Sequence, residues 1–401
     1  MADLYRLNQR AAAVQPSSTL AMTARAGELK RQGLPVIGLS AGEPDFTTPA
    51  PIVEAAERAM RDGWTHYTDN AGLMELRVAV ADKLRRDNGL SYEPTQILLS
   101  NGAKQSIAQA VLGLVDDGDE VVIVSPYWVS YPEMVRMAGG VPVVAETRVE
   151  DGYVLRPEVL EAAITEKTRM VLLNSPSNPS GVVYDRATQE ALADVLRRHP
   201  GIVVVSDEIY EYVVYDAEHV SFASLDGMHE RTITVNGFSK GYAMTGWRLG
   251  YLAAPTPLFK VCARLQSQLT SAPSTISQKA GVAALAMDRR YIDEMVAAFR
   301  ERRDYLMGRL SAVGGLVLPR PDGAFYLFPD VSHYFGTTSP TGRVIEGSDE
   351  LAYYLLEDAH VALVPGDGFG APSGLRFSYA ASMDDLAEAA DRVVAALNAL
   401  S

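Results

Sequence analysis

Between residues 96 and 254, short and almost entirely apolar runs alternate with stretches that have the periodicity of helices. Val, Ile and Leu fill successive positions of these runs, which is typical of strands buried on both faces of a mainly parallel sheet. We therefore predict a large α/β domain with a seven-stranded sheet. The expected strands are 97–100, 120–124, 141–144, 170–174, 202–206, 232–235 and 249–253, with helices expected over 106–115 and 187–198.

The flanking parts of the chain have a different texture. Before residue 96 the pattern predicts an arm, a helix ending near Gly33, a strand over 35–39, a helix capped by Thr48, and a further helix ending at Asn88. After about residue 290, longer amphipathic helices surround isolated strands, which predicts a smaller α+β domain. We expect three divisions: 1–47 as an N-terminal arm and part of the small domain, 48–285 as the large domain, and 286–401 as the small C-terminal domain.

Composition and charge restrict the class of protein. Apolar residues make up 47% of the chain and charged residues 21%, as in ordinary globular proteins. The formal net charge of −14 disfavours nucleic acid as a partner, because such binding rests on a basic surface. A single cysteine, Cys262, excludes an internal disulfide, and no apolar run is long enough to span a membrane. We expect a cytoplasmic protein that contacts no membrane, and no metal site, because the six histidines are scattered.

Polar residues follow several of the expected strands, at the edge where open α/β sheets bind ligands. Residues 101–105 open a helix whose free N–H groups could bind a phosphate. Trp128, the proline-rich loop 175–181 and Asp207 follow three other strands. Each also has a purely structural interpretation: core packing for Trp128, a rigid turn for the loop, and a helix cap for Asp207.

The segment 231–251 joins two expected strands through a loop that carries Lys240 and, eight residues later, Arg248. Small residues surround the lysine, so the backbone there can approach a bound molecule closely. A lysine between two strands is otherwise a solvated surface residue. This segment alone does not indicate a site. Together with the polar residues at the other strand ends, it becomes a candidate for the centre of one.

In combination, the phrases SPYWVSYPEM, SDEIYE and NGFSKGYAMTGWRLGY resemble the fold-type-I, pyridoxal-phosphate-dependent aminotransferases, in particular the class I group that contains the bacterial aspartate aminotransferases. The resemblance extends from AGEPDF to the C-terminal helix. It implies pyridoxal 5'-phosphate as cofactor, amino acids and 2-oxo acids as substrates, and a homodimer with shared active sites. The implied reaction is reversible amino transfer from L-aspartate to 2-oxoglutarate by a ping-pong mechanism.

The resemblance also assigns roles to residues of the cofactor site. Lys240 would bind the cofactor covalently and carry a proton during the reaction, and Asp207 would keep the pyridine nitrogen protonated. Tyr210 and Asn178 match positions that hydrogen-bond the cofactor's O3′, and Trp128 matches the ring that stacks on the pyridine.

The phosphate of the cofactor would be bound by Arg248 and by the backbone of Gly102, Ala103 and Lys104. Tyr67 matches a tyrosine that reaches the phosphate of the neighbouring subunit. One departure from the family pattern is Gly237, where better-known relatives carry a serine that contacts the phosphate.

Substrate recognition is implied for a second set of residues. Arg376 would bind the α-carboxylate of the substrate with its planar guanidinium, helped by the backbone at Gly42, while Trp128 and Asn178 also border the substrate. An arginine paired with a core acid is the structural alternative for Arg376. Lys104 would read the side-chain carboxylate, and Ser17 and Thr19 match a segment that closes over the same end.

Other functions stay open at this point. An aminotransferase of the same class for prephenate, glutamate or aromatic amino acids is the first alternative, and a pyridoxal-phosphate lyase or decarboxylase is more remote. The sequence GLSAG at 38–42 has the spacing of a serine hydrolase elbow, but Pro44 and Pro49 forbid the helix that such an elbow needs. A non-catalytic regulator would need a DNA-binding extension or a basic stretch, which this sequence lacks.

Overall fold

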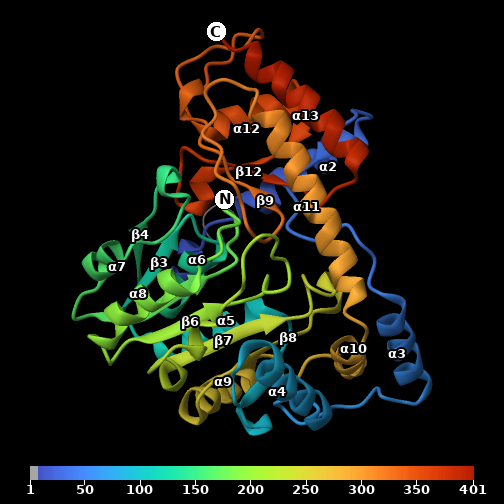
Figure 1. Cartoon of the computed structure of the whole chain (residues 1–401), viewed down its shortest axis with the longest axis vertical. Helices are drawn as coiled ribbons and strands as arrows, with labels where there is room; N and C mark the ends of the chain where they lie inside the picture. Colours follow the sequence, from blue (N-terminus) through green and yellow to red (C-terminus); the bar gives the residue numbers. More distant parts are fainter. Residues whose placement is uncertain (1–7) are drawn as a thin grey trace, which may run out of the picture.

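The computed structural model describes residues 8–401, so residues 1–7 of the expected arm lie outside the described residues. Its lower part in Figure 1 is built on a sheet with strand order β2-β8-β7-β6-β5-β3-β4. Strand β8 is antiparallel to β2 and β7, and the other neighbours are parallel. The predicted seven-stranded, mainly parallel sheet is confirmed. Its strands are β2 (Ile97–Ser100), β3 (Glu120–Ser125), β4 (Val141–Glu146), β5 (Thr168–Asn174), β6 (Val203–Asp207), β7 (Thr232–Gly237) and β8 (Gly250–Ala253).

Helices cover both faces of this sheet, which explains why its strands are apolar at successive positions. Along β3, Val121 and Ile123 pack into the cluster that includes α5, whereas Val122 between them packs into the cluster that includes α8. The helices are α1 (Gln9–Ala13), α2 (Ser18–Arg31), α3 (Ala50–Arg61), α4 (Met74–Asn88), α5 (Ala103–Leu114), α6 (Ser130–Ala138), α7 (Pro157–Ala163), α8 (Arg186–Arg197), α9 (Thr256–Leu269), α10 (Thr275–Ala286), α11 (Arg290–Leu310), α12 (Ser348–Glu357) and α13 (Met383–Asn398). Among the described residues, no helix is both long and apolar enough to cross a bilayer.

A second hydrophobic core lies above the sheet in Figure 1, where α2, α11, α12 and α13 gather around short strands. Strand β1 (Ile37–Gly38) pairs in parallel with β10 (Val361–Ala362), and β12 (Leu375–Ser378) lies between β11 (Val364–Pro365) and β9 (Tyr326–Leu327). N-terminal and C-terminal segments thus share this core. The domain boundaries at 47/48 and 285/286 stay predictions.

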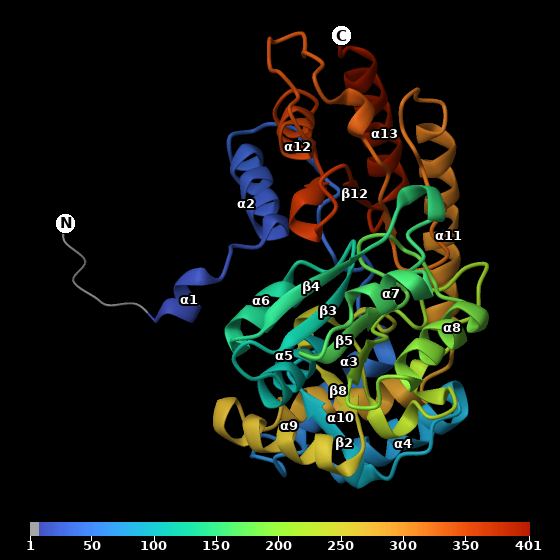
Figure 2. The same cartoon turned by 90° about the vertical axis from the view of Figure 1, so that its left-hand side faces the viewer.

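The chain between α1 and α2 connects the two parts (Figure 2). Helix α1 packs against α6 on the side of the sheet, and the backbone N–H of Gln15 donates to Glu133 of α6 at 2.9 Å. Helix α2 then packs into the second core through Met22 and Leu29. This path brings the first turn of α2 to the edge of the sheet where the strands end.

Some local predictions were wrong. Thr48 does not cap a helix: α3 begins at Ala50, and the Thr48 hydroxyl donates to the carbonyl of Ala243 at 2.7 Å and accepts from the indole N–H of Trp247 at 2.9 Å. That hydroxyl therefore ties the start of α3 to the loop after β7. Helix α5 begins at Ala103, three residues before the expected start, and the strand expected over 35–39 shortens to β1.

Candidate active site

The carboxyl ends of β5 and β6, the loop after β7 and the first turn of α5 enclose a cavity of about 310 Å³. The cavity also receives residues from α2 and from β12 in the second core. Ser17, Thr19, Gly42, Ala103, Lys104, Trp128, Asn178, Asp207, Tyr210, Lys240, Arg248 and Arg376 all line it. The structure thus brings together residues separated by more than three hundred positions in the sequence.

Lys240 lies in the loop after β7, with its amino group buried near the rings of Tyr210 and Phe325 in the second core. Its Nζ donates to the carbonyl of Gly42. Burial lowers the pKa of Lys240 to about 8; Glu43 acts in the opposite direction, and the nearby Arg376 and Arg248 reinforce the lowering. An amine with this pKa is partly neutral near neutral pH, so it can act as a nucleophile or a base.

Asp207 ends β6 with its carboxylate buried beneath the cavity. It accepts from the hydroxyl of Tyr131 at 2.6 Å and from the backbone N–H of Ile209 at 3.2 Å. Burial raises the pKa of Asp207 to about 6, and the Tyr131 hydrogen bond limits the rise. No helix begins directly after Asp207, because residues 209–212 form turns, so the helix-cap interpretation is wrong.

Arg376 on β12 is 1% exposed, and its guanidinium lies between the rings of Tyr326 and Phe369, 4.7 and 5.0 Å from their centroids. It donates to Asn178 Oδ1 at 2.9 Å and to the carbonyl of Ser40 at 2.7 Å, while its Nε–H has no partner. Within residues 8–401 no carboxylate pairs with it, so the alternative of a core ion pair is wrong. A buried guanidinium without a counterion is a binding site for an anion.

Arg248 lines the same cavity beside the first turn of α5, which begins without a side-chain cap. Arg248 is held there by hydrogen bonds to the carbonyls of Thr245 (2.8 Å) and Asn101 (3.2 Å). Gly102 has a φ of 81°, and a Cβ there would lie 2.5 Å from Arg248 Nη2. Glycine thus lets the guanidinium lie directly against the helix N-terminus, where backbone N–H groups and positive charge converge.

Lys104 reaches the cavity from the first turn of α5. Its Nζ lies 4.9 Å from the centroid of the Trp128 ring, and burial, followed by repulsion from Arg248, lowers its pKa. Ser17 caps α2 by accepting from the N–H of Leu20 at 3.4 Å, and Thr19 lines the same end of the cavity. Lys104, Ser17 and Thr19 therefore lie where the resemblance expected them, and their roles stay predictions.

A family model described as aminotransferase class I and II matches residues 35–393. The chain belongs to this family. It is 54% identical to an aspartate aminotransferase of Pinus pinaster over 96% of this chain and 80% of that protein. It is 53% identical to a bifunctional aspartate aminotransferase and glutamate/aspartate-prephenate aminotransferase of Petunia hybrida, over 98% and 82% of the two chains. The solved structure of an aspartate aminotransferase from Rhizobium meliloti matches with a TM-score of 0.96 and 45% identity, covering 99% of this chain and all of the other.

Membership of this aminotransferase family implies pyridoxal phosphate as cofactor, and the cavity fits that group. The uncapped start of α5 and Arg248 suit a phosphate, the Trp128 ring offers a flat stacking face, and Asp207 offers a buried carboxylate for a protonated ring nitrogen. Lys240 supplies the amine. The cavity therefore offers a suitable group for the phosphate, for the ring nitrogen and for the aldehyde of the implied cofactor.

Tyr67 is the one proposed site residue that lies clearly apart from this aminotransferase cavity. Its side chain is 99% exposed, and it borders a separate groove formed by residues 64–68 and 272–276. A single chain therefore does not bring Tyr67 to the phosphate site.

Sequence reasoning missed several residues of the cavity. Tyr131, one helical turn after Trp128, bonds to Asp207, and Asn174 at the end of β5 donates to the backbone carbonyl of Asp207 at 2.9 Å. Ser239 and Thr245 also line the cavity. The phrases that carry the resemblance contain Tyr131, Ser239 and Thr245, so their position beside assigned residues was the available signal.

The departure at Gly237 has a steric reason. A Cβ on Gly237 would lie 2.9 Å from the Cα of Gly250 on the neighbouring strand. A Cβ on Gly250 would in turn lie 2.5 Å from the backbone nitrogen of Ala103. The backbones of β7, β8 and α5 are therefore in direct contact behind the phosphate site, and a serine has no room at position 237.

Proposed function

We propose that this aminotransferase transfers the amino group of L-aspartate reversibly to 2-oxoglutarate. The observation that carries the proposal is that two cations, Arg376 and Lys104, line one cavity without a carboxylate partner among residues 8–401. A substrate with two carboxylates supplies an anion for each. The names of the relatives from Pinus pinaster and Rhizobium meliloti support the same substrate.

The protein's own residues divide the work in this proposal. Arg376 binds the α-carboxylate of the substrate and Lys104 the distal one, so that the Cα–H bond is held beside Lys240. Lys240 Nζ takes the proton from Cα of the amino acid and, in the reverse half-reaction, gives a proton to Cα of the oxo acid. Its pKa of about 8 permits both transfers. When bound, pyridoxal phosphate supplies the electron sink that makes the Cα–H bond acidic.

The remaining residues of the cavity would orient the cofactor and adjust its electronic properties. With the cofactor bound, Asp207 would hold the proton at the ring nitrogen, Tyr210 and Asn178 would bond to the ring hydroxyl, and Trp128 would cover the ring face. Ser17 and Thr19 on α2 close the end of the cavity near Lys104 and exclude water from it.

A homodimer completes this proposal. Tyr67 is a fully exposed aromatic side chain outside the cavity, which supports its role at the phosphate site of a second copy. Mixing a Tyr67→Phe chain with a Lys240→Ala chain should generate hybrids in which one site is unaltered, giving activity that neither variant has alone. A protein that sediments as a monomer at micromolar concentration would contradict it. The cytoplasmic location stays a prediction.

Glutamate and prephenate are a second substrate class, favoured by the name of the relative from Petunia hybrida. Both are dicarboxylates and would use the same two cations. A panel of aspartate, glutamate, prephenate (with an amino donor), phenylalanine and alanine, measured by 2-oxo acid formation, tests the proposal. Aspartate should give the highest kcat/KM with 2-oxoglutarate as acceptor, and equal turnover of alanine and aspartate would overturn it. Two cavity cations without a carboxylate partner among residues 8–401 favour these dicarboxylates over aromatic amino acids. The relatives carry aminotransferase names, which disfavours the lyase alternative.

A further inference from the structure

The end of β6 and the turn after it present some side chains to the cavity and others to the interior behind it. Asp207 and Tyr210 line the cavity, whereas Glu208 and Glu211 do not. Both glutamates are nevertheless buried. The turn has no regular secondary structure of its own, so its shape depends on contacts made by these side chains.

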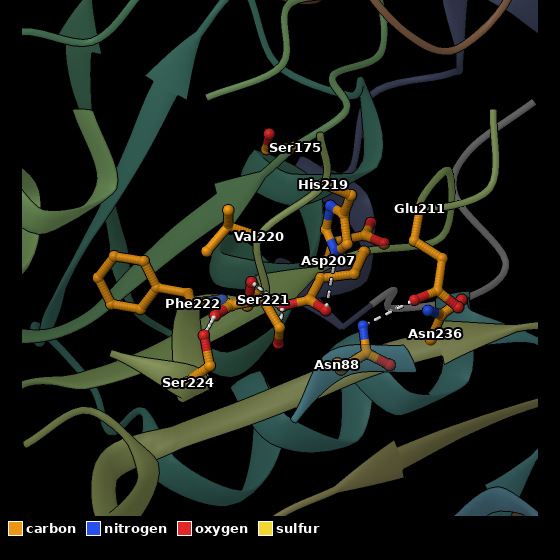
Figure 3. A network of polar contacts seen from close by, with 12 residues as sticks. Asn88, Ser175, Asp207, Glu211, His219, Val220, Ser221, Phe222, Ser224 and Asn236 are labelled. Carbon is orange, nitrogen blue, oxygen red and sulfur yellow. Dashed lines mark hydrogen bonds and ion pairs between the residues drawn. The ribbon is translucent and has the colours of Figure 1, made fainter. Parts of the chain in front are cut away.

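Glu211 is bound from behind by α4. It forms an ion pair with Lys83, whose side chain is 1% exposed. Asn88, the last residue of α4, bridges the pair: its Nδ2 donates to Glu211 at 2.9 Å, drawn in Figure 3, and its Oδ1 accepts from Lys83 Nζ at 2.7 Å. Each charge therefore has two partners, and the geometry of all three side chains is fixed.

Glu208 is bound by the next part of the chain. It accepts from the hydroxyls of Ser206 (2.9 Å) and Ser221 (2.8 Å) and from the backbone N–H of Phe222 (3.3 Å), and it contacts His219 at 3.2 Å. His219 and Ser221 lie together beside the turn in Figure 3. The two glutamates thus attach one irregular turn to two separate segments.

Glu208, Glu211 and His219 lie within 4.8 Å of one another, which is compact enough for a metal ion. Their oxygens, however, already accept from an ammonium group, an amide, two hydroxyls and a backbone N–H. These donors surround the cluster with positive charge and hydrogen atoms that would repel a cation. We interpret the cluster as a hydrogen-bonded charge network.

We propose that Lys83, Asn88 and Glu211 are positioning residues of the reaction, which hold the turn so that Tyr210 and Asp207 point into the cavity. The proposal rests on the proposed function, because it concerns how these two residues meet the cofactor. A buried ion pair contributes little net stability, since desolvation of both charges offsets their attraction. Directional contacts between α4 and an irregular turn instead specify one conformation, and a shift of even 1 Å in a catalytic group lowers rates substantially.

The double variant Lys83→Met/Glu211→Leu tests this without leaving a charge unpaired. Replacing a whole buried pair by apolar residues is often neutral for stability, so the melting temperature should change little. We expect kcat to fall about tenfold while KM changes less than about twofold, because Arg376 and Lys104 still bind the substrate. The pH dependence of the visible absorption of the cofactor-loaded enzyme should also shift, since Tyr210 no longer meets the ring hydroxyl in one fixed position. An unchanged kcat and an unchanged absorption profile would overturn the proposal.

A charge exchange, Lys83→Glu/Glu211→Lys, is the rescue. Asn88 can turn its amide over and bond to both residues in reversed roles, so this variant should recover most of the lost kcat. A charge-exchanged variant that is as stable as the parent but keeps the lowered kcat would overturn a positioning role. The Arg343→Met/Glu357→Leu variant is a control for removing an ion pair away from the cavity, and its kcat should equal that of the parent. Arg25, which also pairs with Glu357, keeps Glu28 as a partner in this control.

Two further measurements keep the test decisive. If the double variant does not fold, Asn88→Ala removes the bridge but neither charge and should lower kcat about two- to threefold with the same shift in absorption; no change would overturn the proposal. The amino acid used is the one that the parent enzyme turns over fastest. If that is not aspartate, the substrate assignment fails while the positioning test still stands.

Discussion

Asp207 and Glu208 are adjacent in sequence and equally buried, yet their pKa values shift in opposite directions. Burial raises the pKa of Asp207 to about 6, because a single hydroxyl and one N–H are its hydrogen-bond donors. Burial alone would also raise the pKa of Glu208. A hydrogen bond and the charge of His219, together with hydrogen bonds from Ser221 and Ser206, outweigh burial and lower that pKa. The carboxylate on the cavity side of the turn therefore has few hydrogen-bond donors, whereas the carboxylate on the interior side has several. Environments that separate the pKa values of neighbouring groups are typical of catalytic sites.

The largest expected effect is on the cavity side, where Lys240 also has no charged partner in hydrogen-bond contact among residues 8–401. Lys240→Ala should abolish transamination, because no other amine lies at that position. It should leave the stability of the cofactor-free protein unchanged or higher, since a buried amine with a lowered pKa is costly to charge. Turnover of aspartate is the measurement. Residual activity close to that of the parent would remove Lys240 from the mechanism.

Asp207→Asn is the direct test of the comparison. Activity should fall by orders of magnitude, because an amide cannot hold the ring proton. The raised pKa means that the folded protein binds more protons than the unfolded chain between about pH 4 and pH 6, so this carboxyl costs stability as the pH rises through that window.

The same variant should therefore be more stable than the parent above pH 6, by about 2–3 kcal/mol in the cofactor-free form. Below about pH 4 the two proteins should have equal stability with respect to this group. Denaturant unfolding at pH 4 and pH 7.5 measures the difference. A variant that is less stable at both values would show that Asp207 is fully satisfied, as Glu208 is.

Lys104→Ala sharpens the comparison at the substrate end of the cavity. A charge-assisted hydrogen bond contributes about 1.5–3 kcal/mol, so kcat/KM for aspartate and glutamate should fall about ten- to a hundredfold. Alanine and phenylalanine, which present no distal carboxylate, should be nearly unaffected. An equal loss for all four amino acids would mean that Lys104 supports only the start of α5.

The smallest expected effect is on the interior side. Glu208→Gln keeps the shape of the side chain but removes its charge, and it should destabilise the protein by about 1–3 kcal/mol at pH 7. Because the folded pKa of Glu208 is lowered, its contribution is present above its ordinary pKa of 4.5 and is lost as the pH falls through the folded value. Unfolding at pH 7 and pH 3.5 should show the difference shrinking. A constant difference would assign it to packing rather than charge.

The sequence allowed the sheet and most of the cavity to be predicted for one physical reason. Strands buried on both faces need apolar residues throughout, so the polar residues that follow them stand out, and the carboxyl ends of parallel strands meet at one edge. Asp207 and the loop that carries Asn178 were identifiable in this way, whereas the resemblance assigned the roles of Asn178 and Lys240. Arg376 and Lys104 were placed by resemblance, and the structure brings them to the same cavity.

Contacts between distant segments were not predictable in this way. Asn88 and Glu211 are 123 residues apart, and neither has a local pattern that indicates the other. Thr48 is a residue type that often caps helices and precedes a proline, but its hydroxyl instead bonds to the loop that carries Lys240. Nothing in the sequence around Tyr131 indicates that its hydroxyl bonds to Asp207 at the end of β6. Such pairings depend on the packed arrangement, which local propensity does not encode.

The contact of three bare backbones behind the phosphate site has a consequence for anyone who wishes to redesign this enzyme. Positions 237 and 250 admit no side chain, because a Cβ at either would meet the backbone of β8 or α5. Saturation libraries at these two positions should therefore return mostly the parent residue, because any side chain there requires the neighbouring backbones to move apart. Changes in cofactor retention are better sought at Ser239 and Thr245, whose side chains already border the cavity and whose replacement leaves the three backbones in place.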